Sequence, residues 1–408
     1  MADLYSYKMK LFIAGCVFLA YFVHALVARQ KGCSFSVHGQ SERNAPILLQ
    51  KDMSLVVPNN GRVELGSWEK ITVACPDPKN YLIGFQSNMT QAQCVQGSIL
   101  RMGNHDVNFT HFLGDFHCKK IVRGTVSKTT KKCGGNKGHI YKIGYPISPG
   151  LFIKVIEVCY DASAGQTLYT KHSLHGQDIK HASKSSYRPG FSPEGSAVSV
   201  SIAYKQTFQK ATFSKLLKSA LLAEEYINKK SYLVRGHLSP DADFLFAATQ
   251  FTTHYYINVS PQWQAINAAN WKKIEYLVRK FADGVKKSFM VITGTYGVLT
   301  VPDAKGQDVE IFLVSGRKLP VAKFVWKIVY STQSKDAIVF VNLNNPFIGG
   351  LETKDILCKD ICKEFGWGAA SWSDFGRGFV YCCDYKQFAA AVETAPKLQV
   401  LGILRGPN

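Results

Sequence analysis

Five side chains between residues 235 and 279 have the types and the spacing that hydrolysis of a phosphodiester requires. His237 comes two residues after Arg235, and Asn267 follows 30 residues after His237, at the expected start of an amphipathic helix. Glu275 and Arg279 continue along that helix. A histidine can take a proton from water near neutral pH, an amide oxygen can hold a hard cation, and an arginine can neutralise charge on a phosphate. This set indicates metal-assisted cleavage of a phosphodiester.

Each of these residues also has a simpler interpretation. One histidine among the eleven of the chain is more often structural or exposed than catalytic. Asn267 could be the N-cap of the helix, and Glu275 and Arg279 could form an exposed helical salt bridge. Against this, Asn267, Trp271, Glu275 and Arg279 recur every four residues, so that their side chains border one seam of the helix.

Mg²⁺ is the cation that this set of side chains favours. The ion keeps several waters and binds phosphate oxygens of the substrate, so one asparagine carbonyl with nearby carboxylates is sufficient. The cation would stabilise charge on the phosphate and on the leaving oxygen, and Arg235 or Arg279 would neutralise the developing negative charge. Mn²⁺ could substitute for it, and no nucleotide cofactor is expected.

The surrounding pattern predicts an α+β fold. His237 is expected at a strand end, with Asp241 as the N-cap of a helix through Thr253. Alternation predicts a strand over 198–204, helical spacing predicts a helix over 212–228, and the polar stretch 180–195 is typical of a surface loop. The later β-rich runs are 290–297, 309–314, 324–330 and 337–341. They predict a central, mainly antiparallel sheet flanked by helices.

Three segments are expected along the chain. Residues 1–28 are predicted to be a secretory signal peptide, because lysines precede an apolar stretch that ends near small residues. That stretch is shorter than the ~20 residues of a membrane span, and a signal anchor is the alternative. Residues 29–160 are predicted to form a small β-rich domain, with strands at 62–65 and 70–74. Residues 161–408 would then hold the catalytic domain, with no membrane contact after cleavage.

Cysteine usage agrees with export. The ten cysteines that follow the apolar stretch fall into an even block of six and an even block of four, which predicts disulfides within each block. They are Cys33, Cys75, Cys94, Cys118, Cys133, Cys159, Cys358, Cys362, Cys382 and Cys383. The last four are expected to form two crosslinks between the pair 358/362 and the pair 382/383, with a zinc site as the alternative. Asn88 and Asn108 are predicted glycosylation sites, whereas Asn258 is expected to be buried and unmodified.

The formal charge of +20 indicates an acidic partner, which could be nucleic acid, an anionic glycan or a membrane surface. A tract without acidic residues between 116 and 156 concentrates this charge. A solvated surface would account for it, but phosphate contacts dominate nucleic-acid affinity, and we favour a patch that follows a phosphate backbone. The predicted nucleic-acid-binding residues are Lys119, Lys120, Arg123, Lys128, Lys131 and Lys132.

The motif as a whole resembles the DNA/RNA non-specific endonucleases, the ββα-metal nucleases. The residues that carry the resemblance are Arg235, Gly236, His237, Asn258, Pro261, Gln262, Ile266, Asn267, Trp271, Glu275 and Arg279. The strings Gly-His-Leu-Ser-Pro-Asp-Ala-Asp-Phe and Pro-Gln-Trp-Gln-Ala-Ile-Asn are similar to the arthropod secreted branch, with its duplex-specific and double-stranded-RNA nucleases. The resemblance implies a ββα-metal core in the catalytic domain.

The resemblance also implies a role for each residue of the motif. His237 matches the general base and Asn267 the single protein ligand of the metal. Glu275 matches the acid that holds metal-bound water, and Arg235 and Arg279 match basic residues near the phosphate.

Two positions of the motif match supporting residues, and a third departs from the family. Asn258 and Gln262 match residues that support the site. Val234 stands where the family often has an aspartate before Arg-Gly-His, which affects how the base is positioned.

Three hypotheses compete on the sequence. The first is a secreted endonuclease of DNA or RNA with little sequence specificity and a duplex preference, acting in saliva or a gut lumen. The second is a catalytically weak nucleic-acid scavenger with the same fold, for which Val234 is the only support. The third is a glycan-binding protein, which explains the charge but leaves the motif to chance. Strand preference, physiological metal, tissue and oligomeric state are open at this stage.

Overall fold

The computed structural model describes residues 32–36, 43–77, 79–109, 117–184 and 187–407. The predicted signal peptide lies outside these residues. Within them, no helix combines the length and the apolar character that a membrane span needs.

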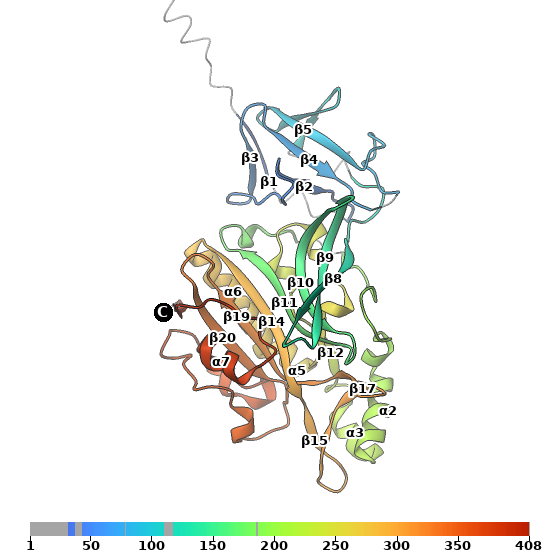
Figure 1. The fold of residues 1–408 in the computed structure, drawn as a ribbon, viewed down its shortest axis with the longest axis vertical. Coiled ribbons are helices and arrows are strands. Elements are labelled where there is room, and N and C mark those ends of the chain that lie inside the picture. Colours follow the sequence, from blue (N-terminus) through green and yellow to red (C-terminus); the bar gives the residue numbers. More distant parts are fainter. Residues whose placement is uncertain (1–31, 37–42, 78, 110–116, 185–186, 408) are drawn as a thin grey trace, which may run out of the picture.

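The N-terminal part is built from two small antiparallel sheets that lie at one end of the molecule (Figure 1). The burial of β3 and β4 alternates along each strand, so that one face of each packs into a separate apolar core. The two-stranded sheet pairs β1 (Cys33–Ser36) with β3 (Arg62–Leu65). The five-stranded sheet has the order β2 (Ile47–Leu49), β4 (Lys70–Ala74), β5 (Met89–Gln96), β6 (Ile99–Met102) and β7 (His105–Asn108). The strands expected at 62–65 and 70–74 are confirmed.

A nine-stranded sheet forms the rest of the scaffold, and its pairs are antiparallel except for the short β22 (Gly402–Ile403), which runs parallel to β20. Its order is β21 (Val380–Cys383), β20 (Asp336–Leu343), β19 (Ala322–Tyr330), β14 (Ser288–Val298), β11 (Gln166–His175), β10 (Leu151–Asp161), β9 (Gly138–Ser148) and β8 (Thr125–Cys133). The predicted α+β class with a mainly antiparallel central sheet is confirmed.

Residue 160, where a domain boundary was expected, lies within β10 of this sheet. Strands β8, β9 and β10 hydrogen-bond into the nine-stranded sheet, so the sheet begins at Thr125. The β9–β10 hairpin belongs both to the N-terminal apolar cluster and to the large sheet. The residues near its turn, Tyr145, Ile147 and Ile153, join the N-terminal apolar cluster. The part of β10 away from the turn, Glu157–Asp161, pairs with β11.

Helices cover both faces of the large sheet. Alternate residues of β19 point to opposite faces: Val325 and Val329 belong to the cluster that includes α6, whereas Trp326 and Ile328 belong to the cluster that includes α7. The helices are α2 (Gln206–Leu217), α3 (Ala220–Tyr226), α4 (Ala247–Phe251), α5 (Gln264–Ile266), α6 (Lys272–Val285) and α7 (Tyr385–Ala391). Short hairpins pair β12 (Leu233–His237) with β13 (Val259–Trp263), β15 (Thr300–Pro302) with β16 (Asp308–Glu310), and β17 (Phe312–Val314) with β18 (Lys318–Pro320).

Three local predictions were wrong. Residues 198–204 form no strand but end in the 3₁₀ turn η4 (Ile202–Tyr204). The single helix expected over 212–228 is two helices, because Lys218 between α2 and α3 adopts left-handed backbone angles. Asp241 is not an N-cap: it begins the 3₁₀ turn η5 (Asp241–Asp243), which is separate from α4.

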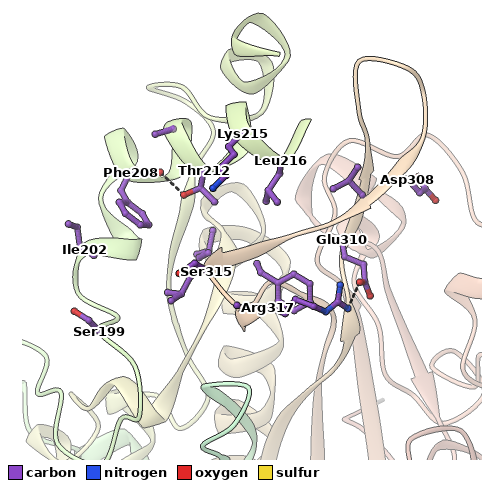
Figure 2. Close-up of a pocket in the computed structure, with 16 residues that line it drawn as sticks. Ser199, Ile202, Phe208, Thr212, Lys215, Leu216, Asp308, Glu310, Ser315 and Arg317 are labelled. Carbon is purple, nitrogen blue, oxygen red and sulfur yellow. Dashed lines mark hydrogen bonds and ion pairs between the residues drawn. The ribbon is translucent and has the colours of Figure 1, made fainter. Parts of the chain in front are cut away.

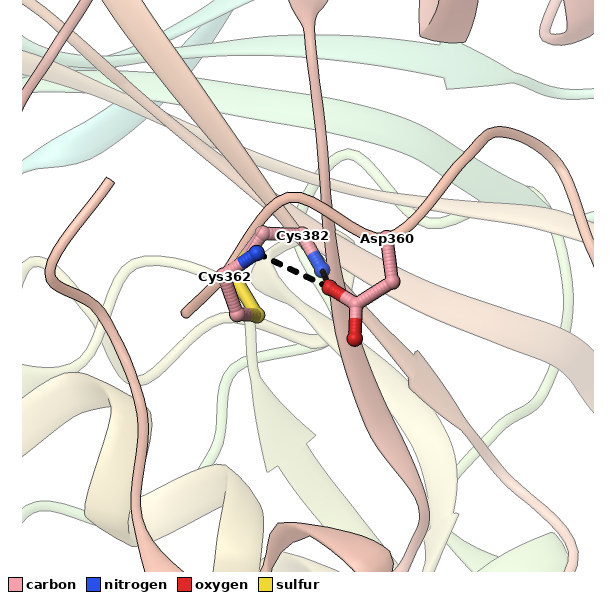
Figure 3. Close-up of side chains that lie close together, drawn as sticks. All are labelled: Asp360, Cys362 and Cys382. Atoms are coloured by element: carbon pink, nitrogen blue, oxygen red, sulfur yellow. Dashed lines mark hydrogen bonds between the residues drawn. A yellow bond between two sulfur atoms is a disulfide. The ribbon is translucent and has the colours of Figure 1, made fainter. Parts of the chain in front are cut away.

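Five disulfides form, and each stays within its expected block. The N-terminal block contains Cys33–Cys94, Cys75–Cys118 and Cys133–Cys159, and the C-terminal block contains Cys358–Cys383 and Cys362–Cys382. The zinc alternative is wrong, because all four C-terminal sulfurs are bonded in pairs. Asp360 lies beside one of these disulfides (Figure 3), where its Oδ1 accepts the backbone N–H groups of Cys362 at 2.9 Å and Cys382 at 3.0 Å. That carboxylate stabilises the crosslinked loop.

Candidate active site

Two short strands and one helix carry the residues of the motif. β12 pairs antiparallel with β13, in a register that places His237 opposite Val259 and Arg235 opposite Pro261. The chain then enters α5 directly and continues to α6. Because strand side chains alternate, Arg235 and His237 project from the same side of β12. This strand–strand–helix order is the ββα core that the motif predicts.

Asn267 lies inside the helical run. It follows α5 and begins a five-residue π-helical turn (Asn267–Trp271) that leads into α6. The N-cap interpretation is therefore wrong. A π turn adds a residue to the helical repeat and is frequent at functional sites, so it alters the four-residue row expected on sequence. The side chain of Asn267 is half-buried and makes no hydrogen bond within the described part of the chain, so its amide oxygen is available as a ligand.

His237 is a neutral imidazole in an apolar and aromatic setting. Its Nε2 is buried without a hydrogen-bond partner among the described residues. The rings of Phe191 and His254 lie 5.3 Å and 5.4 Å from the His237 ring, centroid to centroid. Burial, followed by the neighbouring His254, lowers the pKa of His237 to about 4, although Asp241 opposes the shift. A neutral histidine can accept a proton, which a general base must do.

Arg235 lies in a cage of three aromatic rings. Its guanidinium carbon is 5.3 Å from the ring centroid of Phe191, 5.2 Å from that of Tyr204 and 5.6 Å from that of Tyr256. The Nε atom is buried and lacks a hydrogen-bond partner among the described residues. Cation–π contacts hold the guanidinium plane without neutralising its charge. The arginine is thereby kept next to His237 as a positive charge.

Arg279 is fixed by a buried carboxylate, and the salt bridge between Glu275 and Arg279 is not formed. Arg279 Nη1 donates to Asp243 Oδ1 at 2.8 Å, and the side chain of Asp243 is only 4% exposed. Asp243 belongs to η5, six residues after His237. Burial raises the pKa of Glu275 to about 7, while the positive charges of Lys327 and Arg279 oppose this shift.

A chain of buried hydrogen bonds connects Arg279 with the end of β12. The second oxygen of Asp243 is 2.9 Å from His172 Nε2, and His172 Nδ1 is 2.9 Å from Ser239 Oγ. Burial lowers the pKa of His172, so this ring is neutral. Asn258 secures the same segment: its amide donates to the carbonyls of Ser239 and Thr253, and its Oδ1 accepts the Ser239 N–H. Asn258 is fully buried, as expected for an unmodified sequon.

Gln262 and Gly236 meet across the β12–β13 ladder. A Cβ on Gly236 would lie 2.2 Å from Gln262 Oε1, so the glycine is required for this close approach. Both polar atoms of the Gln262 side chain are buried and unpartnered within the described residues.

The basic residues divide into separate groups. Lys119 and Lys120 are exposed beside the N-terminal sheet, with Lys119 5.0 Å from the Tyr81 ring. Lys128, Lys131 and Lys132 are exposed on β8, the edge strand of the large sheet.

Arg123, the remaining member of the predicted basic patch, has a structural contact instead. Its Nη2 donates to the carbonyl of Gly190 at 2.8 Å and to that of His254 at 3.3 Å. It therefore stabilises the segments around the His237 ring.

Several residues next to the motif were not predicted from the sequence. Phe191 lay in the polar stretch assigned to a surface loop, and His172 precedes the motif on another strand. Asp243 was within the quoted string but was assigned to a helix start.

Lys327 was not predicted as part of the site either, because a lysine within an apolar β run does not indicate a function. It is 1% exposed and donates to Thr293 Oγ1 at 2.5 Å, and its Nζ lies 5.0 Å from the ring centroid of Trp271.

A groove of about 870 Å³ lies apart from the motif, between α2 and the hairpins β15–β16 and β17–β18 (Figure 2). Apolar side chains such as Phe208, Leu216 and Phe312 line most of it, and Arg317 pairs with Glu310 at its edge. His237, Asn267 and Glu275 are not among its lining residues.

The donor set at the motif fits a hard divalent cation. Asn267 is half-buried, its amide oxygen makes no hydrogen bond among the described residues, and oxygen ligands suit Mg²⁺ and Mn²⁺. The fold and this donor set agree with the class of protein that the motif resembles, the ββα-metal nucleases.

Comparison with known proteins agrees with this class. The pattern of the DNA/RNA non-specific endonuclease family matches residues 136–388. The chain belongs to this family. It is 33% identical to a salivary endonuclease of Lutzomyia longipalpis over 282 residues, covering 68% of the chain and 66% of that relative.

Two further relatives align over longer stretches. Salivary protein Tsal2A of Glossina morsitans morsitans is 26% identical over 96% of the chain and 98% of the relative. A salivary endonuclease of Culex quinquefasciatus is 26% identical, with 86% of each chain covered. These similarities confirm the arthropod branch that the motif suggests.

Proposed function

We propose that this protein is a secreted Mg²⁺-dependent endonuclease that hydrolyses phosphodiester bonds of DNA or RNA with little sequence specificity and a preference for duplexes. The observation that carries the proposal is the neutral His237 imidazole, whose Nε2 has no hydrogen-bond partner among the described residues, on the same side of β12 as the caged Arg235. Membership of the endonuclease family and the salivary endonucleases among its relatives support it.

In the proposed mechanism each side chain has one task. His237 takes the proton of the attacking water, because its unpartnered ring nitrogen is neutral near pH 7. Arg235 and Arg279 bind the phosphate and neutralise negative charge that develops on it. Asn267 would hold Mg²⁺, or Mn²⁺ in its place, and Glu275 would orient water bound to the ion. The cation, when bound, supplies Lewis-acid stabilisation of the phosphate and of the leaving oxygen.

The basic surface and the crosslinked fold match this proposal. Lys119, Lys120, Lys128, Lys131 and Lys132 would bind the phosphate backbone outside the centre of the site. Five disulfides suit an extracellular compartment such as saliva or a gut lumen, where the exposed Asn88 and Asn108 would carry glycans.

The test is cleavage of matched double-stranded DNA, double-stranded RNA and single strands by the purified secreted protein, with Mg²⁺ and with a chelator. We expect metal-dependent cleavage that a His237→Ala variant loses, while a His105→Ala variant on the exposed β7 strand retains it. Salt-sensitive binding without cleavage under any divalent cation would instead identify a nucleic-acid scavenger. Val234, in place of the family's aspartate, is the residue that favours that second outcome.

A further inference from the structure

The ring of Phe191 lies at the centre of the aromatic groups around the motif. Its centroid is 5.3 Å from the His237 ring, 5.2 Å from the His254 ring and 5.6 Å from the Tyr256 ring. The guanidinium carbon of Arg235 lies 5.3 Å from the same centroid. One side chain therefore contacts both the proposed base and an arginine proposed to bind phosphate.

The backbone beside Phe191 is held in place by hydrogen bonds on both sides of the residue. The carbonyl of Gly190 accepts from Arg123 Nη2 at 2.8 Å. The N–H of Ser192 donates to the carbonyl of His254 at 2.9 Å, and the carbonyl of Ser192 accepts the N–H of Tyr256 at 3.0 Å. The chain is thus paired with the segment that carries two of the rings that Phe191 touches.

Glu194 attaches the same segment to the large sheet. Its Oε1 accepts the backbone N–H of Val126 at 2.9 Å and the hydroxyl of Thr125. Gly195, with a φ of +80°, packs against Val126 so closely that a Cβ would lie 2.8 Å from that side chain. Residues 190–195 lie in the surface loop expected on sequence, and these contacts attach the loop to the site and to the large sheet.

We propose that Phe191 is a positioning residue for the reaction: it covers one face of the His237 imidazole, keeps bulk water from that face, and fixes the ring next to the caged guanidinium of Arg235. This inference rests on the proposed function, in which His237 is the base. A phenyl ring offers no hydrogen bond to the imidazole, which agrees with the buried and unpartnered Nε2. Orientation of the base within a fraction of an ångström is worth large factors in rate.

Burial is the largest cause of the lowered pKa of His237, and Phe191 is one of the rings packed against its imidazole. Asp241 raises the pKa of His237, whereas Arg188 and His254 lower it, and burial exceeds all three. The guanidinium carbon of Arg235 lies 5.3 Å from the centroid of the Phe191 ring. Removal of the phenyl ring would admit water to the imidazole, and water favours the protonated form.

The first test is an NMR pH titration of the His237 imidazole in the full-length protein, with the signal assigned by its absence in His237→Ala. We expect Phe191→Ala to raise the pKa of His237 by at least about one unit, toward the ordinary value of about 6.5. Phe191→Leu, which keeps an apolar cover, should shift it by less than about half a unit. The matched control is Phe85→Ala, because Phe85 lies edge-on to His105 in the N-terminal sheet, with 6.3 Å between the centroids.

A second variant keeps the test decisive if Phe191→Ala does not fold. Glu194→Ala removes an exposed anchor of the segment and should raise the pKa of His237 in the same direction by a smaller amount. An unchanged pKa of His237 in a folded Phe191→Ala or Glu194→Ala protein would overturn the proposal.

Cleavage rates separate the two proposals. At pH 7 the kcat of Phe191→Ala should fall roughly tenfold to a hundredfold, because the base is displaced, while KM rises by a smaller factor. Tyr204 and Tyr256 still hold Arg235 in this variant. An inactive wild-type protein would refute the endonuclease function, whereas the titration would still decide whether Phe191 covers His237.

Discussion

Substitution of Asp243 tests how the side chains of the site are held in place, because this buried carboxylate contacts both Arg279 and His172. Its side chain is 4% exposed, with Oδ1 at 2.8 Å from Arg279 and Oδ2 at 2.9 Å from His172. Burial alone would raise the pKa of this carboxyl. The hydrogen bond from His172 and the positive charge of Arg279 outweigh that effect and lower the pKa to about 2. Asp243 is therefore ionised throughout the neutral range.

Two substitutions of Asp243 remove different parts of this interaction. Asp243→Ala leaves the Arg279 cation and the His172 N–H without partners, and loss of one member of a buried pair costs about 3–5 kcal/mol. Asp243→Asn keeps the shape and an acceptor for Arg279. Its amide can donate to His172, whose ring then donates through Nδ1 to Ser239. Only the charge is lost, so the expected cost is about 1–2 kcal/mol.

Calorimetric unfolding measures this difference. For a domain of this size each kcal/mol lowers Tm by about 2 °C, so we expect losses of roughly 6–10 °C for Asp243→Ala and 2–4 °C for Asp243→Asn. The control is Asp283→Ala on α6, the helix that carries Arg279. It breaks an exposed pair with Lys286 and should shift Tm by less than about 2 °C. Equal effects of the alanine and asparagine variants, or an Asp243→Ala effect no larger than that of the control, would refute the reasoning.

Three further results are expected. Combining Cys358→Ser with Cys362→Ser removes both C-terminal crosslinks, which close loops of 25 and 20 residues, and should cost about 3 kcal/mol for each disulfide in urea unfolding. As pH falls from 7 to 5, His237 gains a proton in the unfolded chain but not in the native one; wild type should therefore lose about 2 kcal/mol of stability that His237→Ala retains. Lys128→Gln combined with Lys131→Gln should weaken nucleic-acid binding and reduce its salt dependence by at most two counterions, as measured by titration at several salt concentrations.

The sequence predicted the parts of the site whose spacing is local. His237, Asn267 and the helix with Glu275 and Arg279 follow one another within 43 residues, and the ββα core has the order that the motif implies. The β-rich runs of the large sheet were predicted because alternation and glycine punctuation mark them. The two disulfide blocks were predicted from the even number of cysteines in each part of the chain.

What the sequence missed depends on contacts across the chain. Phe191 contacts His237 from 46 residues away, and its segment contains few other apolar residues. The strand expected at 198–204 did not form, since alternation over a few residues does not supply a partner strand. The π turn at Asn267 has no signature in composition. The sequence also provided no sign that the β9–β10 hairpin belongs to the large sheet and contributes to the N-terminal apolar cluster.

The charges around α6 bear on the proposal that Asn267 is the protein ligand of a cation. Asp243 and Glu275 are the acidic groups of this cluster, and the cations Arg279 and Lys327 interact with both of them. Asp243 already has both oxygens engaged by Arg279 and His172. It is therefore not available as a ligand, whereas the amide oxygen of Asn267 and the carboxylate of Glu275 make no hydrogen bond among the described residues. An ion held this way keeps most of its coordination positions for water and phosphate, which suits Mg²⁺.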